Sequence, residues 1–169
     1  MNDAKNAAMV WKTFDENTIT HSSAHHLLAI DELRARRGYA RVTDVAKHLE
    51  ISRGSASVTL KALKSRGYVT EDDNKFLRLT AAGKRIVQTV AANRQVVIAF
   101  LRDVLAVSAE QAEIDACKVE HLFSAETGER FVHFLDFLFS KEKSAAAFLA
   151  AYQTAARSVF EKPSDFTHA

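Results

Sequence analysis

The sequence has little of what interrupts helices and nothing that could cross-link a small fold. It contains one proline and five glycines in 169 residues. Because these residue types break or end helices, their scarcity predicts a mostly helical chain. A single cysteine excludes an internal disulfide, and disulfides are typical of secreted proteins. No apolar run reaches the roughly 18 residues of a membrane-spanning helix, and no charged-then-apolar leader opens the chain. We therefore expect a cytosolic (cytoplasmic) location and no membrane partner.

The net charge is only +2, but acidic residues are scarce in one part of the first half and basic residues are scarce in one part of the second half. From Arg34 to Arg66 there are nine Lys or Arg residues and two acidic ones. From Glu110 to Glu142 there are eight acidic residues and three basic ones. The asymmetry predicts that the first half meets a polyanion. Solvated helix faces that happen to differ in charge are the other interpretation.

Apolar periodicity and capping residues predict three helices in the first half. The first covers about 22–37 and ends at Gly38, a residue type that tolerates positive φ. The second is short, about 44–49, with Thr43 as its N-cap, and the third follows its own N-cap, Ser52. Two short helices joined by a few residues form the helix-turn-helix pattern.

Two short β-prone runs, 68–70 and 76–79, flank a turn-rich spacer and predict a hairpin. Three helices followed by a hairpin form the winged-helix arrangement, here in the most basic third of the chain. We therefore expect the third helix to enter the major groove of a double-stranded DNA operator, with Arg53 reading guanine. The predicted DNA-binding residues are Arg41, Ser52, Arg53, Gly54, Ser55, Ser57, Lys61 and Lys64. The first and the last two are expected to contact phosphates.

The second half predicts helices only. A long helix over about 81–105 follows its cap Thr80, Ser108 and Ser124 begin two more, and the last covers about 144–160. The large apolar residues of this half exceed what solvated helices need, so we expect a homodimer.

The predicted fold class is mainly α, with an N-terminal winged helix-turn-helix that carries a small β-hairpin wing, followed by an all-helical dimerisation domain. The predicted domains are an arm over residues 1–20, a DNA-binding domain over 21–80 and a helical domain over 81–169.

The only cysteine lies in the run Asp115-Ala116-Cys117-Lys118-Val119-Glu120-His121. On a helix, Cys117, Glu120 and His121 project from one side, and a thiolate with nitrogen and oxygen donors is half of a transition-metal shell. Spacing alone leaves two other interpretations. Cys117 is a buried structural residue, or it is a nucleophile with His121 as its base, although nothing nearby supplies an oxyanion hole.

Several stretches together resemble the diphtheria-toxin-repressor family, which includes the iron-dependent repressors and the manganese-transport regulators. They are the run from Gly38 to Ala46, the winged helix, the long helix after it, and the pattern Asp115-Ala116-Cys117-x-x-Glu120-His121-x-x-Ser124. The resemblance implies a homodimeric, metal-responsive transcriptional repressor of metal homeostasis genes. It also implies that a divalent metal bridges the first helix to the dimerisation helices, which makes 81–169 the metal-binding domain and fixes the spacing of the DNA-reading heads.

Carried over by position, the resemblance implies Cys117, Glu120 and His121 as metal ligands, with His25 in place of the family's first-helix ligand. His21, one turn earlier, is a further candidate. Thiolate and imidazole suit iron(II) better than manganese(II). The predicted cofactor is therefore one divalent transition-metal ion per subunit, with Fe(II) preferred over Mn(II).

The sequence departs from this family at several ligand positions. Arg94 stands where the family has a histidine ligand, and Ile98 and Leu28 stand where it has carboxylates, so we do not expect a second metal site. A guanidinium near Glu120 would supply fixed positive charge in place of a metal. A metal-independent winged-helix regulator is therefore one alternative, as is one responding to a small ligand or to Cys117 oxidation. A thiol-dependent enzyme is a remote third, and we do not expect an enzyme.

Overall fold

Each half of the chain has a hydrophobic core of its own. The computed structural model describes residues 19–160. The chain separates into two compact units, the first ending at Ala91 and the second beginning at Ala92, and this boundary lies within one helix, α5 (Ala81–Ala99). Apart from its last two residues, the predicted N-terminal arm lies outside the described residues.

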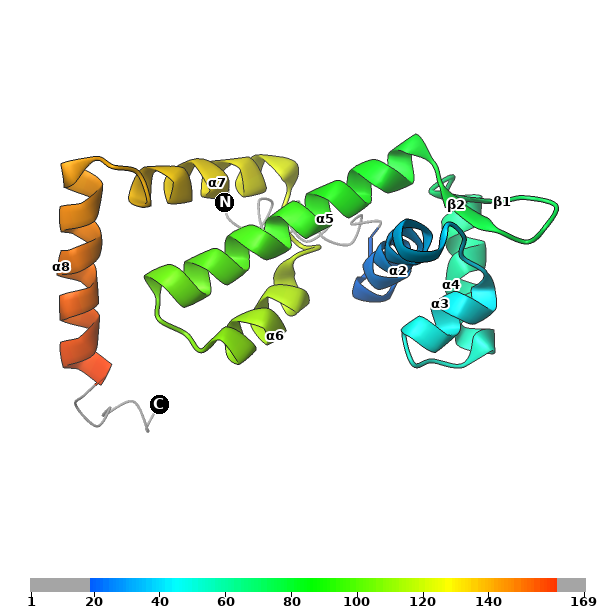
Figure 1. The fold of residues 1–169 in the computed structure, drawn as a ribbon, viewed down its shortest axis with the longest axis horizontal. Helices are drawn as coiled ribbons and strands as arrows, with labels where there is room; N and C mark the ends of the chain where they lie inside the picture. Colours follow the sequence, from blue (N-terminus) through cyan, green and yellow to red (C-terminus); the bar gives the residue numbers. More distant parts are fainter. Residues whose placement is uncertain (1–18, 161–169) are drawn as a thin grey trace, which may run out of the picture. The chain divides into compact units, whose positions relative to one another are not determined.

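From residue 19 onward, the first unit consists of three helices, a hairpin and the start of α5 (Figure 1). Its other elements are α2 (His21–Arg37), α3 (Val42–His48), α4 (Arg53–Ser65), β1 (Val69–Glu71) and β2 (Leu77–Leu79). Helix α2 packs against α3, α4 and β2, and α3 packs against α4. The strands pair antiparallel, with Val69 opposite Leu79. The predicted mainly helical class with a hairpin after the helix-turn-helix is confirmed.

Apolar residues at helical spacing form the core of the first unit. Side chains from α2, α3, α4 and both strands meet there and are almost fully buried: Leu27, Ile30, Leu33, Val45, Leu60, Leu63, Val69 and Leu77. Each such side chain contributes about 1.5–3 kcal/mol through burial. The core therefore fixes which face of α4 turns inward and leaves the polar face for solvent.

Two predicted caps of the first unit are confirmed. The Oγ of Ser52 accepts a hydrogen bond from the backbone N–H of Ser55 at 3.1 Å. The Oγ1 of Thr80 accepts one from Gly83, also at 3.1 Å. Gly38 ends α2 in the left-handed region, with φ 80°. These ends are set by local hydrogen bonds, which is why the sequence predicts them.

The predicted N-cap Thr43 is wrong. Helix α3 begins at Val42, which places Thr43 within the helix and Arg41 at the N-cap. The carboxylate of Asp44 accepts the backbone N–H of Arg41 at 2.9 Å. The third helical residue thus satisfies the chain entering the helix, and no side-chain oxygen is needed at the cap.

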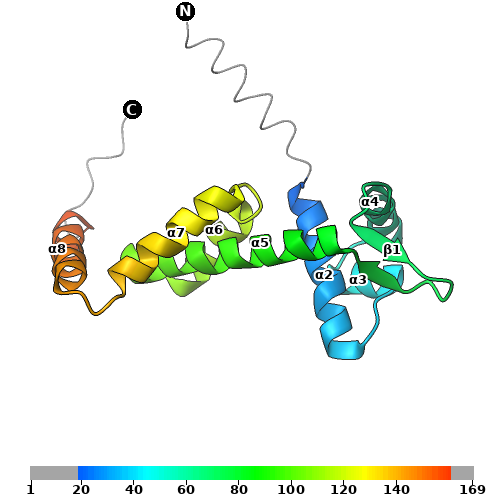
Figure 2. The same ribbon diagram turned by 90° about the horizontal axis from the view of Figure 1, so that it is seen from above.

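The second unit is helical throughout its described part. Its elements after α5 are the π-helical turn η1 (Phe100–Val104), α6 (Ala109–Val119), α7 (Ala125–Leu138) and α8 (Lys143–Phe160). The rings of Phe100 and Phe131 are 5.0 Å apart, and Figure 2 shows α7 beside the second part of α5. Helix α7 also packs against α8. Among the described helices, none has both the length and the apolar character to cross a membrane.

The long helix predicted over 81–105 ends differently from expectation. Its last turn is π-helical, and the backbone N–H of Leu105 donates to the carbonyl of Phe100 at 3.1 Å. A π-turn accommodates one more residue than an α-turn. Apolar periodicity alone did not predict this turn.

Gly83 provides a test of the packing between the start of α5 and the hairpin. A Cβ at this position would lie 2.2 Å from the carbonyl oxygen of Tyr68. We expect Gly83→Ala to lower the free energy of unfolding by about 1–3 kcal/mol, because the backbones must move apart. The measurement is urea unfolding of the full chain.

The control is Gly54→Ala, in which the nearest atom to the new Cβ is the Ser52 Oγ at 3.7 Å. It should be neutral, or stabilising by about 0.5–1 kcal/mol. Equal losses in both variants would contradict the packing argument.

Candidate nucleic-acid interface and metal centre

Helix α4 turns its predicted DNA-reading face to solvent. Its buried residues are Ala56, Leu60 and Leu63. The exposed predicted residues are Ser52, Arg53, Gly54, Ser55, Ser57 and Lys61. The N-terminal end of α4 therefore presents one guanidinium among small side chains, which is the arrangement that close approach to base edges requires.

Val58 also lies on the exposed part of α4, and sequence reasoning missed it. Its side chain is 72% exposed. It falls between the buried positions Ala56 and Leu60, so the helical period could have placed it outside the core. An exposed valine next to polar residues can make apolar contact with a thymine methyl group.

Lys64 differs from the other predicted DNA-binding residues. It is half-buried, and its ammonium forms an ion pair with the carboxylate of Glu71 on β1. The hydrogen bond from Lys64 lowers the pKa of Glu71 and outweighs the effect of burial, which would raise it. Lys64 thus fastens α4 to the hairpin. Its predicted contact with a phosphate stays a prediction.

Arg41 stacks on two aromatic rings. Its guanidinium carbon lies 4.8 Å from the centroid of the Phe76 ring and 5.9 Å from that of Tyr39. The two rings are 5.3 Å apart. Stacking restricts an otherwise mobile side chain, so the exposed cation at the start of α3 is held in place beside the hairpin.

The pair formed by Lys64 and Glu71 generates a stability prediction. We expect Lys64→Met to lower the free energy of unfolding by about 0.5–1 kcal/mol, and we expect this loss to shrink when Glu71→Gln is also present. The wild-type advantage should be full above pH 4.5, the ordinary pKa of this carboxyl. It should disappear as the pH falls through the lowered pKa, because protonation removes the charge of Glu71. Urea titrations at several pH values measure both effects. Lys61→Met is the matched control and should show no such pH dependence.

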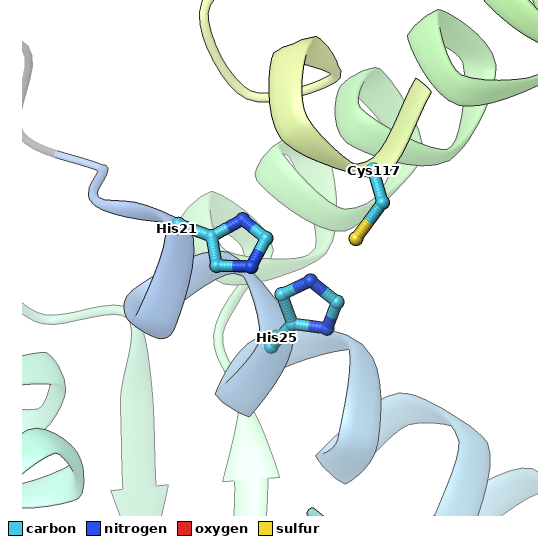
Figure 3. Close-up of side chains that lie close together, drawn as sticks. All are labelled: His21, His25 and Cys117. Carbon is cyan, nitrogen blue, oxygen red and sulfur yellow. The ribbon is translucent and has the colours of Figure 1, made fainter. Parts of the chain in front are cut away.

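Two of the three neighbouring histidines of α2 lie together. The rings of His21 and His25 have centroids 4.4 Å apart, and Figure 3 shows both on one stretch of α2. His21 is exposed and His25 is half-buried. The third, His26, is buried, and its Nδ1 lies 2.6 Å from the carbonyl oxygen of Ser22. Since a carbonyl only accepts, Nδ1 donates. His26 is thus engaged within its own helix.

The second group of predicted ligands lies at the C-terminal end of α6. Ser108 caps this helix as predicted, accepting the backbone N–H of Gln111 at 3.2 Å. Helical geometry persists to Glu120, whose N–H donates to Ala116 at 2.9 Å. Cys117, drawn in Figure 3, is half-buried, as is His121. Glu120 is fully buried.

Arg94 on α5 binds the carboxylate of Glu120. Its Nη1 lies 3.1 Å from Oε2 of Glu120, and its Nη2 lies 2.8 Å from Oε2 of Glu113. Burial lowers the pKa of Arg94, but the hydrogen bonds to Glu113 and Glu120, with a further one to Cys117, outweigh it and raise the pKa. The predicted placement of a guanidinium near Glu120 is thus present. The contact with Glu113 was not predicted.

Asn93, the residue before Arg94, binds the main chain of Glu120. Its side chain is 3% exposed, and its Nδ2 donates to the carbonyl oxygen of Glu120 at 3.0 Å. A Cβ on Gly128 of α7 would lie 2.3 Å from Oδ1 of Asn93, so α7 approaches this amide closely. Two consecutive residues of α5 therefore fix the backbone and the carboxylate of Glu120. Sequence reasoning missed Asn93, because a lone asparagine in an apolar stripe gives no specific signal.

The donor atoms fit a divalent transition metal. The described residues offer two neighbouring imidazoles on α2, and a thiol and an imidazole at the end of α6. Nitrogen and sulfur donors suit iron, cobalt, nickel and zinc, whereas oxygen donors suit manganese and magnesium. Of the predicted ligands, Glu120 alone is an oxygen donor, and one of its oxygens accepts from Arg94.

Comparison with known proteins identifies the family of this chain. Residues 80–143 match a family model described as the iron dependent repressor, metal binding and dimerisation domain. The HTH-type transcriptional regulator MntR of Lysinibacillus sphaericus is 30% identical over 105 residues, which is 62% of this chain and 75% of that protein. The chain belongs to the metal-dependent repressor family. It is a transcriptional regulator that depends on a divalent metal, and it is not an enzyme, so the thiol-enzyme alternative is wrong.

Solved structures share the fold of this chain. T. acidophilum IdeR superposes with a TM-score of 0.56 at 22% identity, covering 70% of this chain and 55% of that one. The manganese regulator SloR superposes with a TM-score of 0.61 at 24% identity, covering 68% and 53%. Membership of the metal-dependent repressor family does not favour the metal-independent alternatives.

Proposed function

We propose that this repressor is a homodimer that binds an operator of metal homeostasis genes when one divalent ion is bound per subunit. The observation that carries the proposal is the Cys117 and His121 pair at the end of α6, inside the segment that matches the family's metal-binding domain. The exposed basic face of α4 supports the DNA-binding part. Operator DNA is the proposed partner, and we propose the cytoplasm as the location because such DNA is there.

The proposed operator contacts are of two kinds: contacts that read bases and contacts with phosphates that position the protein. Arg53, at the first position of α4, is the proposed guanine reader, since a guanidinium pairs with two acceptors of that base. Val58 is proposed to contact a thymine methyl group. Lys61 and the stacked Arg41 are proposed to bind phosphates, which adds affinity but little sequence preference.

The proposed metal ligands come from α2 and from the end of α6. His21 and His25 offer imidazole nitrogens, and Cys117 and His121 offer sulfur and nitrogen. When bound, the ion supplies a double positive charge that all these donors share. Because α2 leads into the helix-turn-helix, donors on α2 and α6 that share one ion would restrict the DNA-reading head. Fewer head arrangements then compete with the one that fits the operator.

We further propose that iron(II) is preferred over manganese(II). The support is the chemistry of the donor set, which is rich in nitrogen and sulfur. SloR, which shares the fold, is a manganese regulator, so the preference must be measured on this chain.

The proposed dimer uses the apolar surface of the second unit. Among the side chains that the structure describes, four exposed phenylalanines lie at its C-terminal helices: Phe134, Phe137, Phe139 and Phe148. A monomer in water seldom leaves such side chains uncovered together. The first three lie within the matched dimerisation domain, which supports a second copy of this chain as the partner.

Metal removal and ligand substitution test the metal dependence. We expect a chelator to weaken operator binding by about tenfold or more, and Cys117→Ser or His25→Ala to weaken cobalt(II) binding by at least about tenfold. The readouts are fluorescence anisotropy with operator DNA and the thiolate-to-cobalt absorption band. His133→Ala is the control, because His133 is exposed on α7. Unchanged operator affinity after chelation would refute the metal dependence.

Arg53 has a separate test. Arg53→Ala should reduce discrimination between the operator and a base-substituted operator by about 1–3 kcal/mol. Lys61→Ala should weaken both complexes about equally and reduce the salt dependence by about one ion. Binding isotherms on both sequences at several salt concentrations distinguish the roles. If Arg53→Ala weakens both complexes equally, Arg53 contacts phosphate instead.

A further inference from the structure

The guanidinium of Arg94 occupies the place where carboxylates would otherwise attract a cation. It donates to Glu120 at 3.1 Å and to Glu113 at 2.8 Å, one bond from each terminal nitrogen. Glu120 is fully buried, and Arg94 is 31% exposed. The backbone of Glu120 is held separately by Asn93. The carboxylate is therefore fixed toward a charge that belongs to the chain itself.

We propose that Arg94 is the specificity-determining residue of the metal centre. It binds one oxygen of Glu113 and one of Glu120, and its charge disfavours a cation at these two carboxylates, so that a single ion is held by thiolate and imidazole donors. The inference rests on the proposed function, since it concerns the same centre. It also reverses the predicted role of Glu120, which becomes the partner of Arg94 and does not ligate the metal.

Charge balance supports one ion. The guanidinium, the two carboxylates and a Cys117 thiolate together carry two negative charges in excess, which one divalent ion neutralises. A second divalent ion would leave an uncompensated double charge next to a guanidinium in partly buried surroundings. There the repulsion is much stronger than in water. The guanidinium does not lose its proton to relieve this repulsion, because arginine stays protonated in proteins.

Donor chemistry supports the choice of ion. Manganese(II) favours carboxylate oxygens, whereas iron(II), cobalt(II) and zinc(II) accept imidazole and thiolate readily. An arginine that binds two carboxylates at once therefore disfavours manganese in particular. A lysine at position 94 would keep the positive charge but could not bind the two carboxylates through two separate nitrogens. The effects of charge and of geometry can therefore be tested separately.

The test measures metal stoichiometry and affinity on the full chain, independently of DNA. Wild-type protein should bind one cobalt(II) per chain, by elemental analysis after dialysis, and should bind manganese(II) at least about a hundredfold more weakly. Arg94→Gln removes the charge but keeps a donor for Glu120. It should strengthen manganese(II) binding by about tenfold or more relative to cobalt(II). Arg94→Lys should have a manganese(II) to cobalt(II) affinity ratio between those of the wild type and Arg94→Gln.

The matched control is Arg102→Gln, because Arg102 forms its ion pair with the adjacent Asp103, at 2.7 Å. Removal of the Arg102 charge should not alter the ratio of manganese(II) to cobalt(II) affinity.

A second variant covers the case in which Arg94→Gln does not fold. Glu120→Gln leaves Arg94 in place and should change cobalt(II) affinity by less than about threefold, whereas loss of a true ligand would cost at least about tenfold. Two ions per wild-type chain, preference for manganese(II), or a large loss in Glu120→Gln would each overturn the proposal and leave a metal-dependent repressor standing. Wild-type protein that binds none of these ions would instead refute the proposed function itself.

Discussion

The carboxylate of Glu120 has no access to water, and the second unit must compensate its charge. A buried carboxylate without a partner costs several kcal/mol. Arg94 provides the opposite charge at 3.1 Å, and Asn93 binds the carbonyl of the same residue. Cys117 and His121 lie within one helical turn of Glu120. The contacts of Arg94 and Asn93 with Glu120 therefore also fix the positions of Cys117 and His121. The same contacts order the end of α6 that carries the proposed ligands.

The first unit follows a similar principle with apolar contacts. The buried residues Ala56, Leu60 and Leu63 hold one face of α4 inward, and the pair between Lys64 and Glu71 joins the helix to the hairpin. Arg41 is held by stacking on Phe76. The exposed face of α4 is thus positioned by groups that need not touch DNA themselves.

Features that depend on neighbouring residues could be predicted from the sequence. The caps Ser52, Thr80 and Ser108 each accept a hydrogen bond from the residue three positions later, so the signal is local. The prediction of Thr43 as an N-cap was wrong for an equally local reason, because the carboxylate of Asp44 already accepts the backbone N–H of Arg41. Propensity cannot decide between two competing oxygens one residue apart.

Features that depend on partners from other elements could not be predicted. Lys64 belongs to a basic run and matches a phosphate contact by pattern, but the fold places Glu71 beside it. Glu113 and Asn93 join the surroundings of Glu120 from two different helices. Only the contact of Arg94 with Glu120 was foreseen, because the family resemblance aligned these positions. The ligand set itself remains a prediction.

The uneven charge along the chain has a consequence for the rate at which it associates with DNA. Nine basic residues between Arg34 and Arg66 face two acidic ones, whereas acidic residues dominate from Glu110 to Glu142. Phosphates attract the first segment and repel the second, and such charge differences steer a protein as it approaches a duplex. Such steering accelerates encounter and weakens steeply with ionic strength. The acidic segment thus affects association by making its own approach to the duplex unfavourable at a distance.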